Sequence, residues 1–178
     1  MKKILLIISI CLLFTGCSLL PRKTTIIGNR ISDNVISTDY GSYTIPSTWT
    51  KRDDHSTANK YFFANKNDNN TIPDNISVEM GTNKYSKDDH MAFNRAILAQ
   101  LNMQVRGSGM TINGSGSTTK NGYPLYTYRM TGKGQTIVQH YIVGDYKYVL
   151  VHETIWHGDT KDTDDAAREI VNTFKWKE

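Results

Sequence analysis

The chain has 178 residues, of which 38% are hydrophobic, and its 21 Lys and Arg against 17 Asp and Glu give a formal charge of +4. This length suffices for one domain with a hydrophobic core. Lys and Arg do not cluster among aromatic residues, so the composition excludes a nucleic-acid-binding protein.

Residues 1–16 have the order of a signal peptide. Lys2 and Lys3 precede an apolar run that extends from Ile4 to Phe14, as basic and apolar regions do in secretory signals. The run is shorter than the roughly 20 apolar residues that a helix needs to cross a bilayer. We therefore expect residues 1–16 to be removed. An ordinary secretory signal and an N-terminal membrane anchor are the alternatives.

Thr15, Gly16 and Cys17 resemble the lipobox of bacterial lipoproteins, in which small residues precede a cysteine that is thioether-linked to diacylglycerol. The resemblance implies that Cys17 becomes the first residue and carries membrane lipid, with acyl chains such as palmitate. Two or more acyl chains anchor a protein stably. A lipidated Cys17 would leave no thiol for a disulfide or a thiolate metal site. Cleavage would leave 19 basic residues against 17 acidic ones, because Lys2 and Lys3 depart with the signal. We expect a protein anchored on the extracytoplasmic face of the cell membrane, or of the outer membrane in a cell with two.

Residues 17–34 are polar and contain Pro21 and Gly28, which predicts a lipidated tether ahead of a single domain over residues 35–178. Two short strands are predicted within 35–49, with a turn near Gly41. Further strands are predicted over 60–68 and 75–82. In the last of these, apolar and polar residues alternate with the period of a half-buried strand.

The period then becomes helical. Ser86 and Asp89 have the spacing of a capping box, and Phe93, Ile97 and Leu101 follow at helical intervals, which predicts a helix to about Arg106. Residues 123–156 read as an antiparallel meander of strands with turns at 132–134 and 144–145. A last helix is predicted from Asp162. This order of strands, helix, meander and helix predicts an α+β fold in which helices cover an antiparallel sheet.

Two short motifs accompany this order of elements. Ile45-Pro46-x-x-Trp49 follows the first strands, and the last helix ends as Thr173-Phe174-Lys175-Trp176. The chain over residues 35–177 resembles the PsbP/Mog1-like superfamily, which includes DcrB-like bacterial lipoproteins. The resemblance implies an α/β/α sandwich and an accessory or binding role, with Trp49 and Phe174 as packing residues. Lipoprotein-carrier and cystatin-like folds are the competing assignments.

The glycine-rich stretch 107–122 does not have the glycine spacing of a phosphate-binding loop. We expect it to be a flexible connection between helix and sheet. Ser117-x-x-Lys120 matches a string of penicillin-binding proteins, but it lies where no helix is expected to present the lysine. No catalytic motif remains, so we expect neither an enzyme nor a cofactor.

Histidines offer one alternative to this reading. His140 and His152 lie on neighbouring predicted strands and could approach each other, with Glu153 turned away. A metal-dependent enzyme that uses His140 and His152 is therefore the less favoured hypothesis. His152 and His157 are an odd number of residues apart, so a regular strand would point them to opposite faces.

Aromatic residues gather in the meander. If the helices leave this face of the sheet open, the aromatic residues would form a surface for a protein, glycan or small hydrophobic ligand. If the helices cover the face, the aromatic residues belong to the core. The residues of this predicted surface are Tyr126, Tyr128, Tyr141, Tyr148 and Trp156. We thus expect a membrane-anchored, non-catalytic binding or accessory module for an unidentified cell-envelope component. The alternative is a carrier of a lipid or another apolar ligand in the concavity of the sheet.

Overall fold

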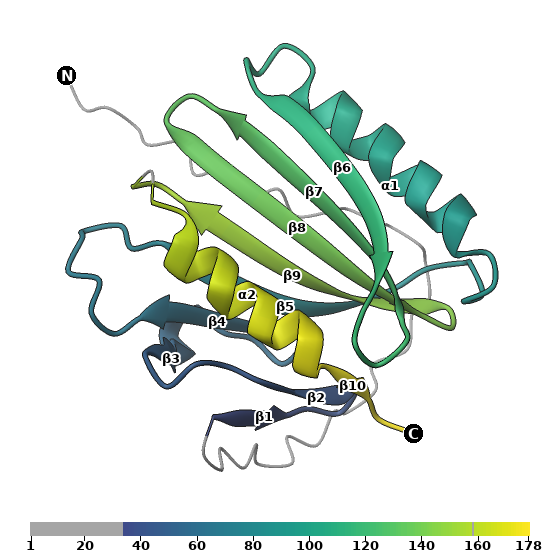
Figure 1. Cartoon of the computed structure of the whole chain (residues 1–178), viewed down its shortest axis with the longest axis horizontal. Coiled ribbons are helices and arrows are strands. Elements are labelled where there is room, and N and C mark those ends of the chain that lie inside the picture. The colour runs from purple at the N-terminus through teal and green to yellow at the C-terminus, as the bar shows by residue number, and fades with distance from the viewer. Residues whose placement is uncertain (1–33, 158) are drawn as a thin grey trace.

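The computed structural model describes residues 34–157 and 159–178 (Figure 1). The predicted signal peptide, Cys17 and all of the tether but its last residue lie outside the described residues. Among the helices that the structure describes, none is long and apolar enough to cross a membrane.

Seven strands form one antiparallel sheet in the order β3-β4-β5-β9-β8-β7-β6. Their bounds are β3 (Trp49–Lys51), β4 (Lys60–Asn65), β5 (Asn75–Thr82), β6 (Thr111–Thr118), β7 (Pro124–Gly132), β8 (Gln135–Gly144) and β9 (Lys147–Ile155). The strands from β6 to β9 follow one another as hairpins. β5 pairs with β9, so the meander adds to strands made earlier in the chain.

A second sheet has the order β1-β2-β10. It consists of β1 (Val35–Ser37), β2 (Gly41–Thr44) and β10 (Lys175–Trp176). β10 pairs antiparallel with β2, which joins the two ends of the described chain. The helices are α1 (His90–Val105) and α2 (Lys161–Thr173), with one short 3-10 helix η1 (Asp53–His55).

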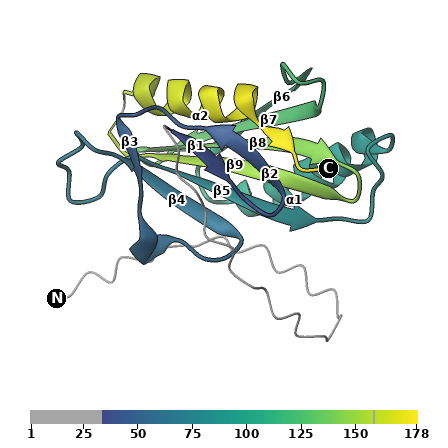
Figure 2. The same ribbon diagram turned by 90° about the horizontal axis from the view of Figure 1, so that it is seen from below.

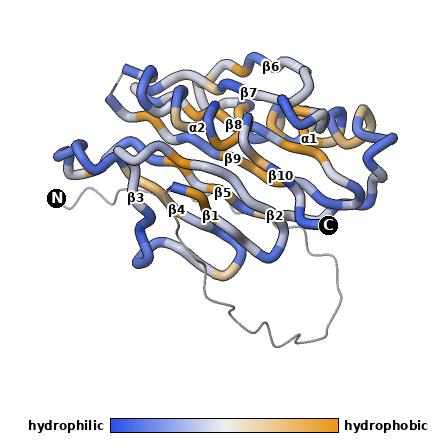
Figure 3. The backbone as a smooth tube through the Cα atoms, turned by 60° about the horizontal axis from the view of Figure 1, so that its bottom comes forward, coloured by the Kyte–Doolittle hydropathy of each residue, from blue (hydrophilic) through white to orange (hydrophobic). Residues whose placement is uncertain are grey.

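Each face of the seven-stranded sheet carries its own core. On one face Phe93, Ile97 and Leu101 of α1 pack on rings of β7, β8 and β9. On the other face α2 and the small sheet pack on β4, β5 and β9, around Phe63, Ile170 and Phe174. Figure 2 shows α2 along one side of the large sheet, and Figure 3 shows hydrophobic stretches along the central strands with hydrophilic loops at their ends.

The predicted α+β fold, an antiparallel sheet covered by helices, is confirmed. The first helix begins at His90, later than the capping box predicts. The side-chain contact of that box exists: the amide of Asp89 donates to Ser86 Oγ at 3.3 Å, and this hydroxyl donates to the Asp89 carboxylate at 3.0 Å. It closes a turn that precedes the helix, because Asp89 is the residue at the N-cap.

The glycine-rich stretch 107–122 was expected to be a flexible connection, and this is wrong for half of it. Residues 111–118 form β6, which pairs with β7 along all eight residues. Gly114 and Gly116 lie opposite Tyr128 and Tyr126, whose rings lean across the ladder. A Cβ on Gly114 would stand 2.8 Å from Tyr128 Cε1, and one on Gly116 3.2 Å from Tyr126 Cε1. These glycines therefore make room for rings rather than giving flexibility.

Candidate functional site

The predicted aromatic surface is mostly core. Tyr126, Tyr128, Tyr141 and Tyr148 are 9%, 2%, 1% and 7% exposed. They lie beneath α1, where Phe93 contacts both Tyr141 and Tyr148. Among the predicted residues only Trp156 is exposed, at the end of β9 and away from that cluster. The alternative stated above, in which the helices cover the aromatic rings and make them core, therefore holds for the four tyrosines.

Polar partners explain why tyrosine is tolerated there. The hydroxyl of Tyr141 donates to Gln139 Oε1 at 2.8 Å, and the hydroxyl of Tyr126 lies 2.6 Å from His90 Nδ1 of α1. Tyr128 bonds Asn94 of the same helix. Burial raises the pKa of Tyr128 to about 12, so this phenol stays neutral. The bonds of Tyr126 and Tyr128 to His90 and Asn94 help to fix α1 on the sheet.

The structure also separates the two histidines of the metal-enzyme hypothesis. Gly144 pairs with Lys147 across a two-residue turn, so His140 lies opposite Val151 and His152 opposite Gln139. Side chains alternate between faces along a strand, which puts His140 on the α2 side and His152 on the α1 side. The expectation that His140 and His152 approach each other is wrong. So is the expectation that Glu153 turns away, because Glu153 Oε1 lies 2.7 Å from His140 Nε2.

His140 belongs instead to a polar network under the start of α2. Thr127 Oγ1 lies 2.9 Å from His140 Nδ1, and Glu153 is 0% exposed. Burial raises the pKa of Glu153, an effect that His140 opposes and Asp164 of α2 reinforces. Arg129 Nη2 donates to Asp164 at 2.6 Å. The network therefore links three neighbouring strands to the first turns of α2.

This hydroxyl, imidazole and carboxylate have the distances of a relay, and they tie three strands to one another. Neither cavity described below is lined by Thr127, His140 or Glu153. The ring of His140 is 16% exposed and has both nitrogens engaged. Burial lowers the pKa of the other histidine, His152, to about 4. The Nδ1 atom of His152 lies 3.1 Å from Gln139 Nε2.

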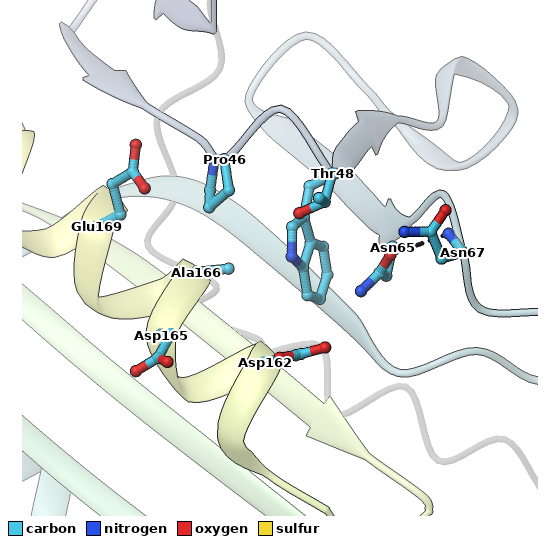
Figure 4. Close-up of a pocket in the computed structure, with 9 residues that line it drawn as sticks. Pro46, Thr48, Asn65, Asn67, Asp162, Asp165, Ala166 and Glu169 are labelled. Atoms are coloured by element: carbon cyan, nitrogen blue, oxygen red, sulfur yellow. Dashed lines mark hydrogen bonds between the residues drawn. The ribbon is translucent and has the colours of Figure 1, made fainter.

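One cavity, of about 260 Å³, lies between α2 and the loops that flank β3 and β4. Figure 4 shows Asp162, Asp165 and Glu169 on α2, and Asn65 and Thr48 across the cavity from the helix. Asp165 is held by Lys161 and by Arg168, with 3.0 Å between the Arg168 Nη1 and the carboxylate. The acidic charge of this cavity is thus partly neutralised by its own helix, and we assign it no ligand.

The most unusual surface is the edge of the sheet formed by β6. β6 is the last strand, so one side of its backbone faces no other strand. Its sequence TINGSGST has no charged residue and no proline, and seven of its eight residues are exposed. The opposite edge, β3, has three residues and ends in Lys51. Proteins ordinarily protect sheet edges with short strands, charges or proline, so β3 follows that practice and β6 departs from it.

This edge was not predicted, because glycines in a sequence usually indicate a loop. The sequence signal for the strand is that its glycines and the tyrosines of the neighbouring strand recur with the same two-residue spacing. Gly114 and Gly116 are two residues apart, and so are the tyrosines at 126 and 128 that they accommodate. Asn113, Ser115 and Ser117 then occupy the other face, beside Thr127 and Arg129, and give the edge a small, polar flank.

Solved structures of PsbP and Mog1 proteins are among those to which the chain is similar. The chain is similar to the solution structure of the cyanobacterial PsbP protein from Synechocystis, with 13% identity and a TM-score of 0.48 over 77% of this chain and 86% of that one. It is also similar to the crystal structure of the Ran-binding protein Mog1p of Saccharomyces cerevisiae, with 12% identity and a TM-score of 0.48 over 76% and 89%. No protein-family model and no curated protein sequence matches the chain. These similarities concern the arrangement of the chain and assign it no function.

Proposed function

We propose that this protein is a non-catalytic binding module that is held at the outer surface of a cell membrane by lipid on Cys17. In this proposal, it takes up an extended segment of another cell-envelope protein as an additional strand beside β6. The other protein would present its own unpaired backbone groups, and main-chain hydrogen bonds would supply the affinity.

The observation that carries the proposal is the contrast between the two edges of one sheet. β6 offers eight residues, all uncharged, to an incoming strand, whereas β3 has three residues and one of them is Lys51. Eight residues of strand extend about 27 Å, and every second residue directs its N–H and C=O outward. A partner of about that length would satisfy these groups, and the small side chains of β6 would let it approach closely.

The membrane anchor is supported by the sequence alone. Residues 1–16 read as a signal peptide, and Thr15-Gly16-Cys17 has the form of a lipobox. The 17 residues from Ser18 to Asn34 would reach about 60 Å when fully extended. A tether of this length would let the β6 edge meet partners well above the lipid surface.

The anchor is tested by fractionation of cells that express the wild type or Cys17→Ser. The wild-type protein should sediment with membranes and gain the mass of its acyl chains. Cys17→Ser should remain a soluble exported protein or an unprocessed precursor. A Cys17→Ser protein that is cleaved after residue 16 and still membrane-bound would refute the anchor.

The edge is tested in intact cells with a photo-crosslinking amino acid in place of Ser115. We expect one discrete adduct, and the same probe in place of the exposed Thr57 should give none. The adduct should disappear when Asn113→Lys and Ser117→Lys protect the edge with charge. Equal labelling from positions 115 and 57, or an adduct that persists in the lysine variant, would refute strand addition at β6.

A further inference from the structure

The β6–β7 loop, the β8–β9 turn and β10 meet at one end of the large sheet (Figure 1). Residues of these segments line a second cavity, of about 360 Å³. Its volume falls within the range of about 300–1,000 Å³ that is usual for small-molecule sites. It is separate from the β6 edge and from the polar network of His140. The residues that define it are Asn121, Tyr123, Gly144, Lys87, Lys147 and Trp176.

Aromatic rings form the apolar part of this cavity. Trp176 packs edge-to-face on Phe174, with 4.8 Å between ring centroids, and Tyr123 meets Trp176 at 6.5 Å. A Cβ on Gly144 would stand 2.9 Å from Trp176 Cε2, so the indole packs directly on the backbone of the β8–β9 turn. The rings are therefore held in place before any ligand arrives.

The indole also presents an unsatisfied donor. Trp176 Nε1 is buried and has no hydrogen-bond partner within the described part of the chain. A buried donor without a partner costs roughly 1–3 kcal/mol.

Two lysines give the cavity its charge. Lys147 Nζ lies 4.6 Å from the centroid of the Trp176 ring, and Lys87 lines the same cavity. Neither ammonium has a carboxylate within ion-pair distance among residues 34–157 and 159–178. The acid of this cavity, Asp145, accepts the backbone amide of Lys87 at 3.2 Å. The cavity thus combines fixed rings and two cations.

We propose that this cavity binds a small organic anion with a flat apolar body, such as an aromatic carboxylate. The apolar body packs against Trp176 and Tyr123. The carboxylate lies within reach of Lys87 and Lys147. This site is independent of the proposed strand addition at β6, so either can fail without the other.

The test uses 2-naphthoate and its uncharged counterpart 2-naphthamide. The protein is the chain from residue 17 with Cys17→Ser, which keeps every residue that the structure describes. Its three tryptophans, Trp49, Trp156 and Trp176, give three indole N–H signals in a nitrogen-15 spectrum, and Trp176→Phe identifies one by its loss. We expect 2-naphthoate to shift the Trp176 signal and leave the other two in place.

The charge requirement is tested by titration. 2-naphthoate should bind at least fivefold more tightly than 2-naphthamide, and Lys87→Gln with Lys147→Gln should remove that preference. The matched control is Lys51→Gln, because Lys51 also stacks over a ring, 5.0 Å from the centroid of Tyr61, outside the cavity. It should leave both affinities within twofold of the wild type. An unmoved Trp176 signal, or equal binding of the two probes to the wild type, overturns the proposal.

Discussion

Gly114→Ala should destabilise the protein, whereas Gly116→Ala should be nearly neutral. The new methyl of Gly114→Ala would stand 2.8 Å and 2.9 Å from two ring carbons of Tyr128. That ring cannot yield easily, because it is 2% exposed, bonded to Asn94 and packed edge-to-face on Tyr141 at 6.2 Å. Such overpacking costs about 1–3 kcal/mol, and replacing a strand glycine by alanine returns about 0.5–1 kcal/mol. The middles of these two ranges give a net loss of about 1 kcal/mol.

At Gly116 the corresponding contacts with Tyr126 are 3.2 Å and 3.4 Å. A displacement of a few tenths of an ångström relieves them, so the gain in strand propensity cancels the crowding. The two variants differ by one methyl at equivalent positions of one strand. Their comparison therefore isolates the ring contact from any general effect of alanine in β6.

The assay is urea unfolding followed by circular dichroism, together with the thermal midpoint, which should fall by about 3 °C for each kcal/mol lost. Gly114→Ala should also be introduced into Tyr128→Ala, where the methyl meets no ring and the penalty should vanish. Equal losses from the two glycines, or a Gly114 penalty that survives in Tyr128→Ala, would refute the assigned pairing of β6 with β7.

Three further predictions concern the polar network of His140 and the ring of Phe174. Burial raises the pKa of Glu153, so the fold favours the protonated carboxyl. The stability that the protonated Glu153 contributes is therefore present below the unfolded pKa and is lost as pH rises through the folded pKa. Glu153→Gln should thus equal the wild type in urea near pH 4 and exceed it near pH 7, with Arg129, His140 and Asp164 unchanged; the opposite trend would contradict the direction of the shift. Arg129→Gln removes a pair whose partners are 38% and 21% exposed and should cost no more than about 1 kcal/mol in the same assay; a loss above about 2 kcal/mol would contradict this. Phe174→Ala deletes a ring that is 0% exposed and should cost about 3–5 kcal/mol; a thermal midpoint within 2 °C of the wild type would contradict the packing of Phe174.

Much of the fold could be predicted because most elements obey a simple period. Ile76 and Val78 alternate with polar neighbours, and Phe93, Ile97 and Leu101 recur at helical spacing, so these elements and the α+β class were identified correctly. The glycine-rich strand was missed because its periodicity lies in small residues that match rings on another strand. Such a match depends on pairing, and a single segment does not display it.

The candidate site was harder to predict because it depends on which face each residue takes. A two-residue turn at Asp145 and Tyr146 fixes the pairing of β8 with β9, and a shift of one residue exchanges the faces. This is why His140 meets Glu153 rather than His152. Likewise, the number of tyrosines in the meander did not reveal that α1 would cover them. Only the packing of α1 decides that.

The pairing of β2 with β10 also constrains the order in which the protein can be completed. Gly41 lies opposite Trp176, and the amide of Thr44 donates to Thr173 Oγ1 at 2.9 Å, across 129 residues. When a chain is made or exported from its N-terminus, β2 emerges early, whereas its partner strand β10 emerges only at the end. Contacts between such distant segments form slowly. The small sheet is thus completed only after release of the final residues, and a chain cut short after α2 would leave β2 without Phe174 or a second neighbouring strand.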